Sequence, residues 1–106
     1  MKTFRLSDMK KGWFVGDFAP TCLASADCEV ACKHYRVGET EGRHFHRIAT
    51  EVTLVVQGRV RMNEEILSAG EIVVLDPGEA TDFAALEDAV TVVVKLPCVA
   101  GDKYDT

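Results

Sequence analysis

Short apolar runs separated by turn-forming residues recur along this chain of 106 residues, and helical periodicity is nearly absent. This pattern is typical of an all-β sandwich or barrel, because each run can form a strand and each turn signal can reverse the chain. A chain of this length buries one modest core, so we predict a single domain over residues 1–106. We expect strands at residues 4–6, 12–16, 28–37, 44–46, 51–57, 59–62, 71–75, 81–85 and 90–96, a hairpin turn at 63–64, and a mobile tail at 101–106.

Two of the expected strands, residues 52–56 and 90–96, lack the alternation of apolar and polar residues. A sheet face that is open to water carries polar residues at every second position, so both faces of these strands are expected to be covered. One face would pack on the barrel interior. A second copy of the chain would cover the other, because so short a chain offers little else, and we therefore predict a homodimer.

Charge and composition exclude some classes of partner. The formal net charge of −5 argues against binding to nucleic acid or to an anionic membrane by bulk electrostatics. The first residues lack the apolar segment of a signal peptide, and no apolar run approaches the length of a transmembrane helix. We therefore expect a cytoplasmic protein, in which Cys22, Cys28, Cys32 and Cys98 are free thiols.

Two of the three histidines lie close together in the sequence, near a carboxylate. His44 and His46 are two residues apart, so a strand places both on the same face, and Glu51 follows shortly after. Two imidazoles and one carboxylate suit a divalent transition metal. The spacing therefore predicts a metal site inside a small β-barrel.

The surrounding residues extend this spacing to a longer pattern. Gly38-x5-His44-x-His46-x4-Glu51-x6-Gly58 resembles the first motif of the cupin superfamily, glycines included. The order and spacing of the remaining expected strands are also similar to those of a small single-domain cupin. The resemblance implies a double-stranded β-helix, a jelly-roll-like barrel, with His44, His46 and Glu51 in its pocket.

The second cupin motif is only partly present. Gly70 and Glu71 open it and Gly78 keeps its turn, but Asp76 stands where the family usually has proline. Thr81 occupies the position of the family's fourth ligand, which is a histidine. The resemblance therefore implies a metal site that lacks one of its usual ligands.

Thr81 and Asp82 are neighbours in an expected strand, so only one of them can point inward. Phe83 favours the core and shares a face with Thr81, which leads us to expect Asp82 to point out. An inward Thr81 would line the pocket, where its hydroxyl could hydrogen-bond a water bound to the metal.

His34, on the strand before the motif, admits two interpretations. It could line the pocket or add a ligand, or it could be an ordinary surface or dimer-interface histidine. Arg59 and Arg61 share a strand face that we expect to be solvated, although it could meet an anionic substrate. Trp13 is expected in the core or at an interface.

Two functions remain open at this point. In the first, His44, His46 and Glu51 hold iron(II), manganese, nickel or zinc, and the open coordination positions serve a small polar metabolite. Small cupins with this set are similar to dioxygenases, isomerases and decarboxylases; an oxidoreductase of the dioxygenase type is slightly favoured. In the second, the barrel binds or senses a sugar or another metabolite without metal and without turnover. The histidines would then hydrogen-bond the ligand directly, with Glu51 as their ionic partner.

Overall fold

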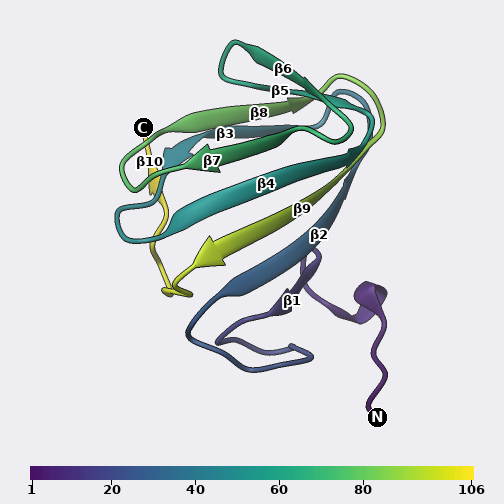
Figure 1. Ribbon diagram of the computed structural model, residues 1–106, viewed down its shortest axis with the longest axis vertical. Helices are drawn as coiled ribbons and strands as arrows, with labels where there is room; N and C mark the ends of the chain where they lie inside the picture. The colour runs from purple at the N-terminus through teal and green to yellow at the C-terminus, as the bar shows by residue number, and fades with distance from the viewer.

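Two five-stranded sheets of antiparallel strands face each other in the computed structural model, which describes all 106 residues (Figure 1). The helical content is one 3-10 turn, η1 (Leu6–Asp8), so no helix is long and apolar enough to cross a membrane. The strands are β1 (Trp13–Val15), β2 (Glu29–Tyr35), β3 (Thr40–Phe45), β4 (Thr50–Gln57), β5 (Arg59–Met62), β6 (Glu65–Ser68), β7 (Ile72–Leu75), β8 (Thr81–Ala85), β9 (Ala89–Leu96) and β10 (Tyr104–Asp105).

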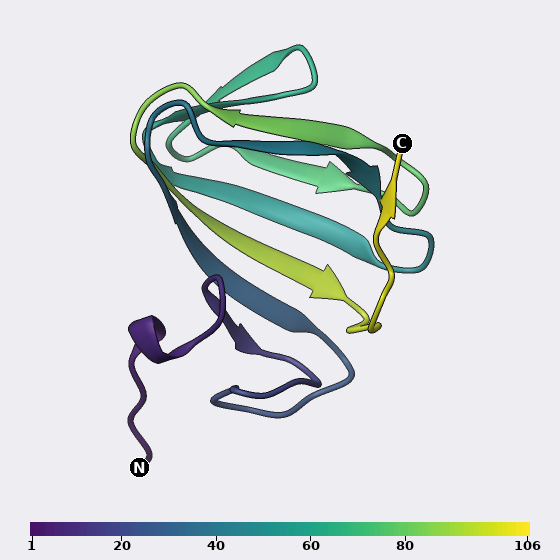
Figure 2. The same cartoon turned by 180° about the vertical axis from the view of Figure 1, so that it is seen from behind.

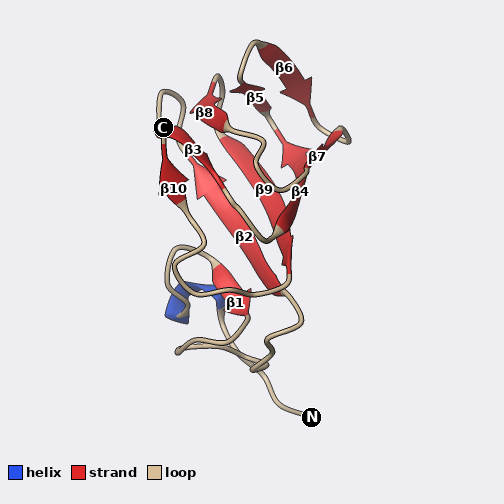
Figure 3. Cartoon of the chain, turned by 90° about the vertical axis from the view of Figure 1, so that its left-hand side faces the viewer, coloured by secondary structure: helices blue, strands red, loops and turns tan.

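The first sheet has the strand order β1-β2-β9-β4-β7 and the second β10-β3-β8-β5-β6. Neighbouring strands are mostly distant in sequence, so the chain passes repeatedly from one sheet to the other. Figure 3 shows the two layers from the side, and Figure 2 shows β10 beside the end of β3. The all-β prediction is confirmed, and so is the hairpin turn between β5 and β6, where Asn63 has a φ of +53°.

Three expectations about the strands are wrong. Residues 4–6 form no strand: Leu6 begins η1, and both Phe4 and Leu6 are exposed, so neither packs into the core that would order a strand there. The strand β6 was not expected, since its four residues give too short an apolar pattern. The tail is not free, because Tyr104 and Asp105 pair with β3 and Asp102 is buried.

The interior is apolar at one end and polar at the other. Along β4 the buried residues run from Glu51 through Thr53 to Val55, and along β8 from Thr81 through Phe83. The apolar end closes the barrel, while the polar end leaves room for chemistry. The core cluster consists of Val55, Val60, Met62, Leu67, Leu75, Phe83, Ala85 and Ala89.

Gly58 allows the tight turn between β4 and β5. Its φ is +82°, and a Cβ added there would lie 2.3 Å from the backbone oxygen of Asp88. Only glycine tolerates both the positive φ and this close approach of backbone. The last glycine of the first motif thus has a structural reason.

The outer face of the first sheet is apolar across four strands. Along β9 the outward residues are three valines and Leu96, and Ile72 and Val74 on β7 are more than half exposed. Leu54 lies in the middle, opposite Val92 on one side and Ile72 on the other. The apolar outward side chains are Val30, Val52, Leu54, Val56, Ile72, Val74, Val90, Val92, Val94 and Leu96.

We propose that a second copy of the chain covers this face, packing the two sheets about a twofold axis. Leu54→Lys should then produce a monomer, because it places a charge at the centre of the interface. Ile66→Lys is the control, since Ile66 is an exposed apolar residue on β6 of the other sheet, outside the proposed interface. Light scattering would measure the masses, and a wild-type monomer at micromolar concentration would contradict the proposal.

Candidate metal centre

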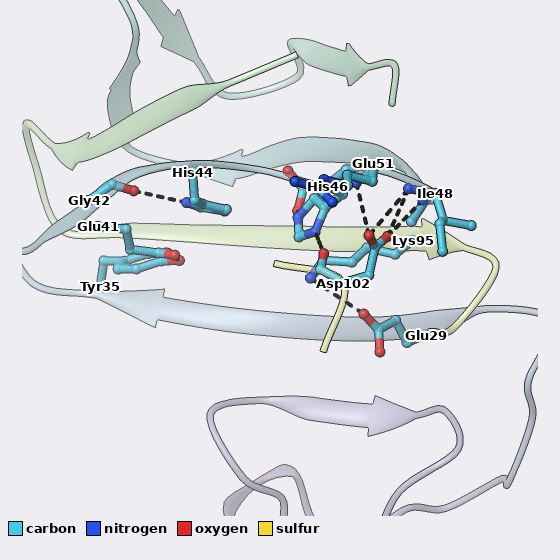
Figure 4. Close-up of polar contacts among 12 residues, drawn as sticks. Glu29, Tyr35, Glu41, Gly42, His44, His46, Ile48, Glu51, Lys95 and Asp102 are labelled. Carbon is cyan, nitrogen blue, oxygen red and sulfur yellow. Dashed lines mark hydrogen bonds and ion pairs between the residues drawn. The ribbon is translucent and has the colours of Figure 1, made fainter. Parts of the chain in front are cut away.

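Asp102, in the C-terminal tail, holds the corner between β3 and β4. Its carboxylate accepts hydrogen bonds from the backbone N–H groups of Arg47 (2.9 Å), Ile48 (3.1 Å) and Ala49 (2.9 Å). Its backbone oxygen accepts a hydrogen bond from Nδ1–H of His46. Figure 4 shows Asp102 between Ile48 and His46. A residue far along the chain thus fixes both the corner and the orientation of the imidazole.

The ionised form of Asp102 is favoured in the folded protein. Burial alone would raise the pKa of the carboxyl, but the three backbone donors outweigh it and hold the pKa below its ordinary value. A carboxylate that accepts several backbone hydrogen bonds stabilises the fold only while it is ionised.

His46 and Glu51 form a buried pair. His46 is 5% exposed and Glu51 8%, and His46 Nε2 lies 3.6 Å from Glu51 Oε1. Since Nδ1–H is donated to Asp102, neutral His46 carries its lone pair on Nε2, which has no hydrogen-bond partner. A lone pair facing a carboxylate is unfavourable without a positive charge between them, and a proton or a metal ion can supply that charge.

The pKa values of the pair reflect this need. The Glu51 carboxylate raises the pKa of His46; burial opposes the shift and the Asp102 carbonyl adds to it. Burial favours neutral Glu51, but His46 and then Lys95 hold its pKa below the ordinary value. Both shifts favour a cation between the two side chains.

His44 lies beside this pair on β3. Its ring centre is 5.4 Å from that of His46, and the rings are nearly perpendicular. Nδ1–H of His44 donates to the backbone oxygen of Gly42 at 2.8 Å, so in the neutral ring the lone pair is again on Nε2. Metal-binding histidines commonly have the other ring nitrogen fixed by a carbonyl in this way.

The donor set therefore fits a divalent metal by its chemistry, with Nε2 of two imidazoles and one carboxylate. The three side chains are not yet close enough to hold an ion together. No three His, Cys, Asp or Glu side chains are grouped closely enough to do so without moving. His44 is half-buried and Glu51 is almost fully buried. The metal ligation by His44, His46 and Glu51 stays a prediction.

The other two predicted pocket residues lie in different surroundings. Thr81 is 4% exposed and faces inward with Phe83, while the carboxylate of Asp82 accepts a hydrogen bond from the N–H of Asn63, as their positions in the strand predict. The hydroxyl of Thr81 donates to the backbone oxygen of Asp82 at 2.7 Å. His34 is exposed, and its Nε2 is 4.0 Å from the sulfur of Cys32.

A hollow of about 1100 Å³ opens between the sheets at the polar end. Thr81 lines its interior and His34 lies at its border, and His44 and Glu51 also line it. His46 borders a second cavity of about 170 Å³, beside Asp102. The main hollow thus reaches two of the three predicted ligands.

Sequence reasoning missed several polar residues at this end of the barrel. The hydroxyl of Tyr35 donates to Glu41 at 2.5 Å across the two sheets, and Lys95 Nζ lies 3.4 Å from Glu29. The available signal was position: these residues occupy inward positions of their strands, but only the strand register shows which residues meet. The missed residues on strands are Glu29, Lys33, Tyr35, Glu41 and Lys95. Asp102 was missed as well; it lies in the loop before β10 and gave no such signal.

The structure of this chain is similar to several solved structures. No family model and no curated protein matches the sequence. A conserved protein with a double-stranded β-helix domain from Klebsiella pneumoniae subsp. pneumoniae MGH 78578 is similar (TM-score 0.71, 24% identity, 77% of this chain and 72% of that one). An RmlC-like cupin from Shewanella frigidimarina NCIMB 400 is similar as well (TM-score 0.66, 18% identity, 71% of this chain and 70% of that one). The DMSP lyase DddQ from Ruegeria pomeroyi DSS-3 is also similar (TM-score 0.73, 15% identity, 89% of this chain and 49% of that one).

The chain therefore has the double-stranded β-helix fold of cupin proteins, which confirms the predicted fold class. These likenesses agree with the fold that the resemblance of the first motif implies. At these identities they show the fold and leave the activity open, because one fold serves many chemistries.

Replacing Asp102 tests the corner directly. Asp102→Ala should lower the free energy of unfolding by about 2 kcal/mol at neutral pH, because buried backbone donors lose their acceptor. The folded pKa is depressed, so this stabilisation is complete above the unfolded value of about 3.9 and is lost as the pH falls through the folded value. Urea unfolding should therefore show the two proteins converging in acid.

Asp105→Ala is the matched control, since Asp105 lies in the same tail, is exposed and accepts no side-chain hydrogen bond. It should behave like the wild type at every pH. A constant difference between wild type and Asp102→Ala down to the most acidic conditions would contradict the role assigned to the ionised carboxylate.

Proposed function

We propose that this protein holds a divalent metal ion through His44, His46 and Glu51 and acts as a small metalloenzyme on a polar metabolite. The observation that carries the proposal is the unpartnered lone pair of His46 Nε2, buried opposite the Glu51 carboxylate at 3.6 Å. Two acceptors facing each other in a buried place favour a cation between them. A metal ion would satisfy both groups at once.

The second imidazole supports the same proposal. His44 and His46 both donate Nδ1–H to a backbone oxygen, so each leaves Nε2 as its metal-binding atom. Iron(II), manganese, nickel or zinc suits two nitrogens and one carboxylate oxygen. A bound metal would act as a Lewis acid or activate oxygen, and dioxygenase and isomerase chemistry both remain candidates.

The residues around the hollow would bind and orient the substrate. Tyr35 and Glu41 bridge the sheets by their hydrogen bond, which fixes the width of the opening near His44. Burial, and then the hydrogen bond to Glu41, raises the pKa of Tyr35, so its hydroxyl keeps its proton. Because that proton is donated to Glu41, the neutral hydroxyl would offer a substrate the lone pair of its oxygen as an acceptor.

A metal-free binding protein is the alternative, and one observation favours it. A proton on His46 can replace the metal, giving an imidazolium that pairs with Glu51, and the raised pKa of His46 points that way. Thr81 also replaces the histidine that is the family's fourth ligand, and its side chain has no nitrogen to bind a metal. Its hydroxyl donates a hydrogen bond to the backbone oxygen of Asp82. The barrel would then bind a sugar or another metabolite without turnover.

Elemental analysis of the purified protein separates the two functions. The metalloenzyme proposal predicts about one metal ion per chain, either as isolated or after soaking in iron(II), manganese, nickel or zinc. His46→Ala and Glu51→Gln should each lose the metal, and a saturating metal should raise the thermal midpoint of the wild type alone. Circular dichroism would verify the fold of each variant.

His34→Ala is the matched control, because His34 is the third histidine of the chain and is exposed. It should keep the full metal content. Wild-type protein that takes up none of the four metals would contradict the proposal and favour the metal-free alternative.

A further inference from the structure

Lys33 is a cation without a counterion at the polar end of the barrel. It is half-buried on the inner side of β2, it takes part in none of the three ion pairs of the chain, and its ammonium donates no hydrogen bond. Of the nearby acids, Glu29 pairs with Lys95, while Glu41 accepts the hydroxyl of Tyr35 and attracts Lys33 only from a distance, without an ion pair. A half-buried ammonium without an ion pair would be stabilised by an anion from outside the chain.

The pKa of Lys33 agrees with this arrangement. Burial lowers it, the Lys95 ammonium lowers it further, and the Glu41 carboxylate opposes both. The pKa is lowered overall, as expected for an ammonium that has lost contact with water and has gained no close carboxylate.

Trp13 holds the two ammonium groups near one another. Lys33 Nζ lies 5.2 Å from the ring centre of Trp13 and Lys95 Nζ lies 4.9 Å from it. Cation–π attraction restrains both side chains on the wall of the hollow. Trp13 lies there because it pairs with Ala31 at the edge strand β1.

Thr91 supplies a second unpartnered group beside Lys33. The two residues are direct partners in the ladder between β2 and β9, and both line the hollow. Thr91 is 1% exposed and its hydroxyl has no hydrogen-bond partner. Buried hydroxyls are almost always hydrogen-bonded, so this pair of donors points independently to an acceptor on a ligand.

The charge of the hollow also favours an anion. Four lysines and three glutamates line it, whereas the whole chain has a formal net charge of −5. The lining lysines are Lys11, Lys33, Lys95 and Lys103. Local positive charge in an acidic protein attracts small anions to this opening.

We propose that Lys33 and Thr91, supported by Trp13, bind the carboxylate group of a small acidic substrate or ligand. The inference deepens the proposed function, because His44 and Glu51 line the same hollow and the subsite would hold one end of the molecule there. A single ammonium and a hydroxyl match a monovalent carboxylate. A phosphate usually takes arginine or several backbone donors, and no arginine lines the hollow.

The fluorescence of Trp13, the only tryptophan, reports on the subsite. At constant ionic strength, malonate and D-gluconate should each give a saturable change, and neutral D-glucose should give none. Lys33→Gln should weaken carboxylate binding about tenfold or more, and Thr91→Val should weaken it to a smaller extent. Lys2→Gln is the matched control, because Lys2 is exposed and outside the hollow.

A second measurement needs no variant. Malonate should protect Lys33 of the wild type from acetylation, read by mass spectrometry, and should leave Lys2 unprotected. Equal binding by Lys33→Gln and Lys2→Gln, or no protection of Lys33, would overturn the subsite. Binding of D-glucose 6-phosphate without binding of either carboxylate would overturn the choice of ligand.

The same titration on the metal-free His44→Ala, His46→Ala variant separates this inference from the metal proposal. Carboxylate binding that persists there and still depends on Lys33 supports the subsite, whether or not the wild type holds a metal. Binding that disappears with the histidines and does not depend on Lys33 overturns the subsite and leaves the metal proposal intact.

Discussion

The hydrogen bonds of Asp102 support the polar end of this barrel. One residue satisfies three consecutive backbone N–H groups at the corner after β3 and also fixes the ring of His46. Without it, buried donors would lack an acceptor and the imidazole could rotate away from Glu51. Nearby aromatic contacts help to hold the tail, since Phe45 and Tyr104 stack at 5.4 Å and Arg47 lies over the ring of Tyr104. The tail is thus part of the site.

The division of the interior into two ends explains how so short a chain combines stability with an open site. Apolar side chains fill the end near Gly58, where the β4–β5 turn brings the sheets together. At the other end, polar residues occupy the inward positions and line the hollow between the sheets. Burying these polar groups is unfavourable unless they are paired, and most are. The exceptions, His46 Nε2, the Thr91 hydroxyl and the Lys33 ammonium, are where we expect ligands to bind.

Much of the fold could be predicted because it depends on local pattern. Most strands follow from apolar runs between turns, and the spacing of His44 and His46 places their rings side by side. The tail and the subsite depend instead on contacts between distant residues. Asp102 is 56 residues from His46, in a segment whose polar composition suggested mobility. Lys33 meets Thr91 only through the register of β2 with β9. A clean apolar pattern would help to specify that register, but neither face of β2 is uniformly apolar.

The central claim is that the tail fixes His46 with Nδ1–H on the Asp102 carbonyl and the lone pair of Nε2 toward Glu51. Long-range ¹H–¹⁵N NMR of the imidazole nitrogens in the metal-free protein, at a pH where the rings are neutral, tests this most directly. The account predicts that His46 is held in the Nδ1–H tautomer and that added zinc shifts the Nε2 resonance. A dominant Nε2–H tautomer, or a ring that averages between both forms, would contradict it.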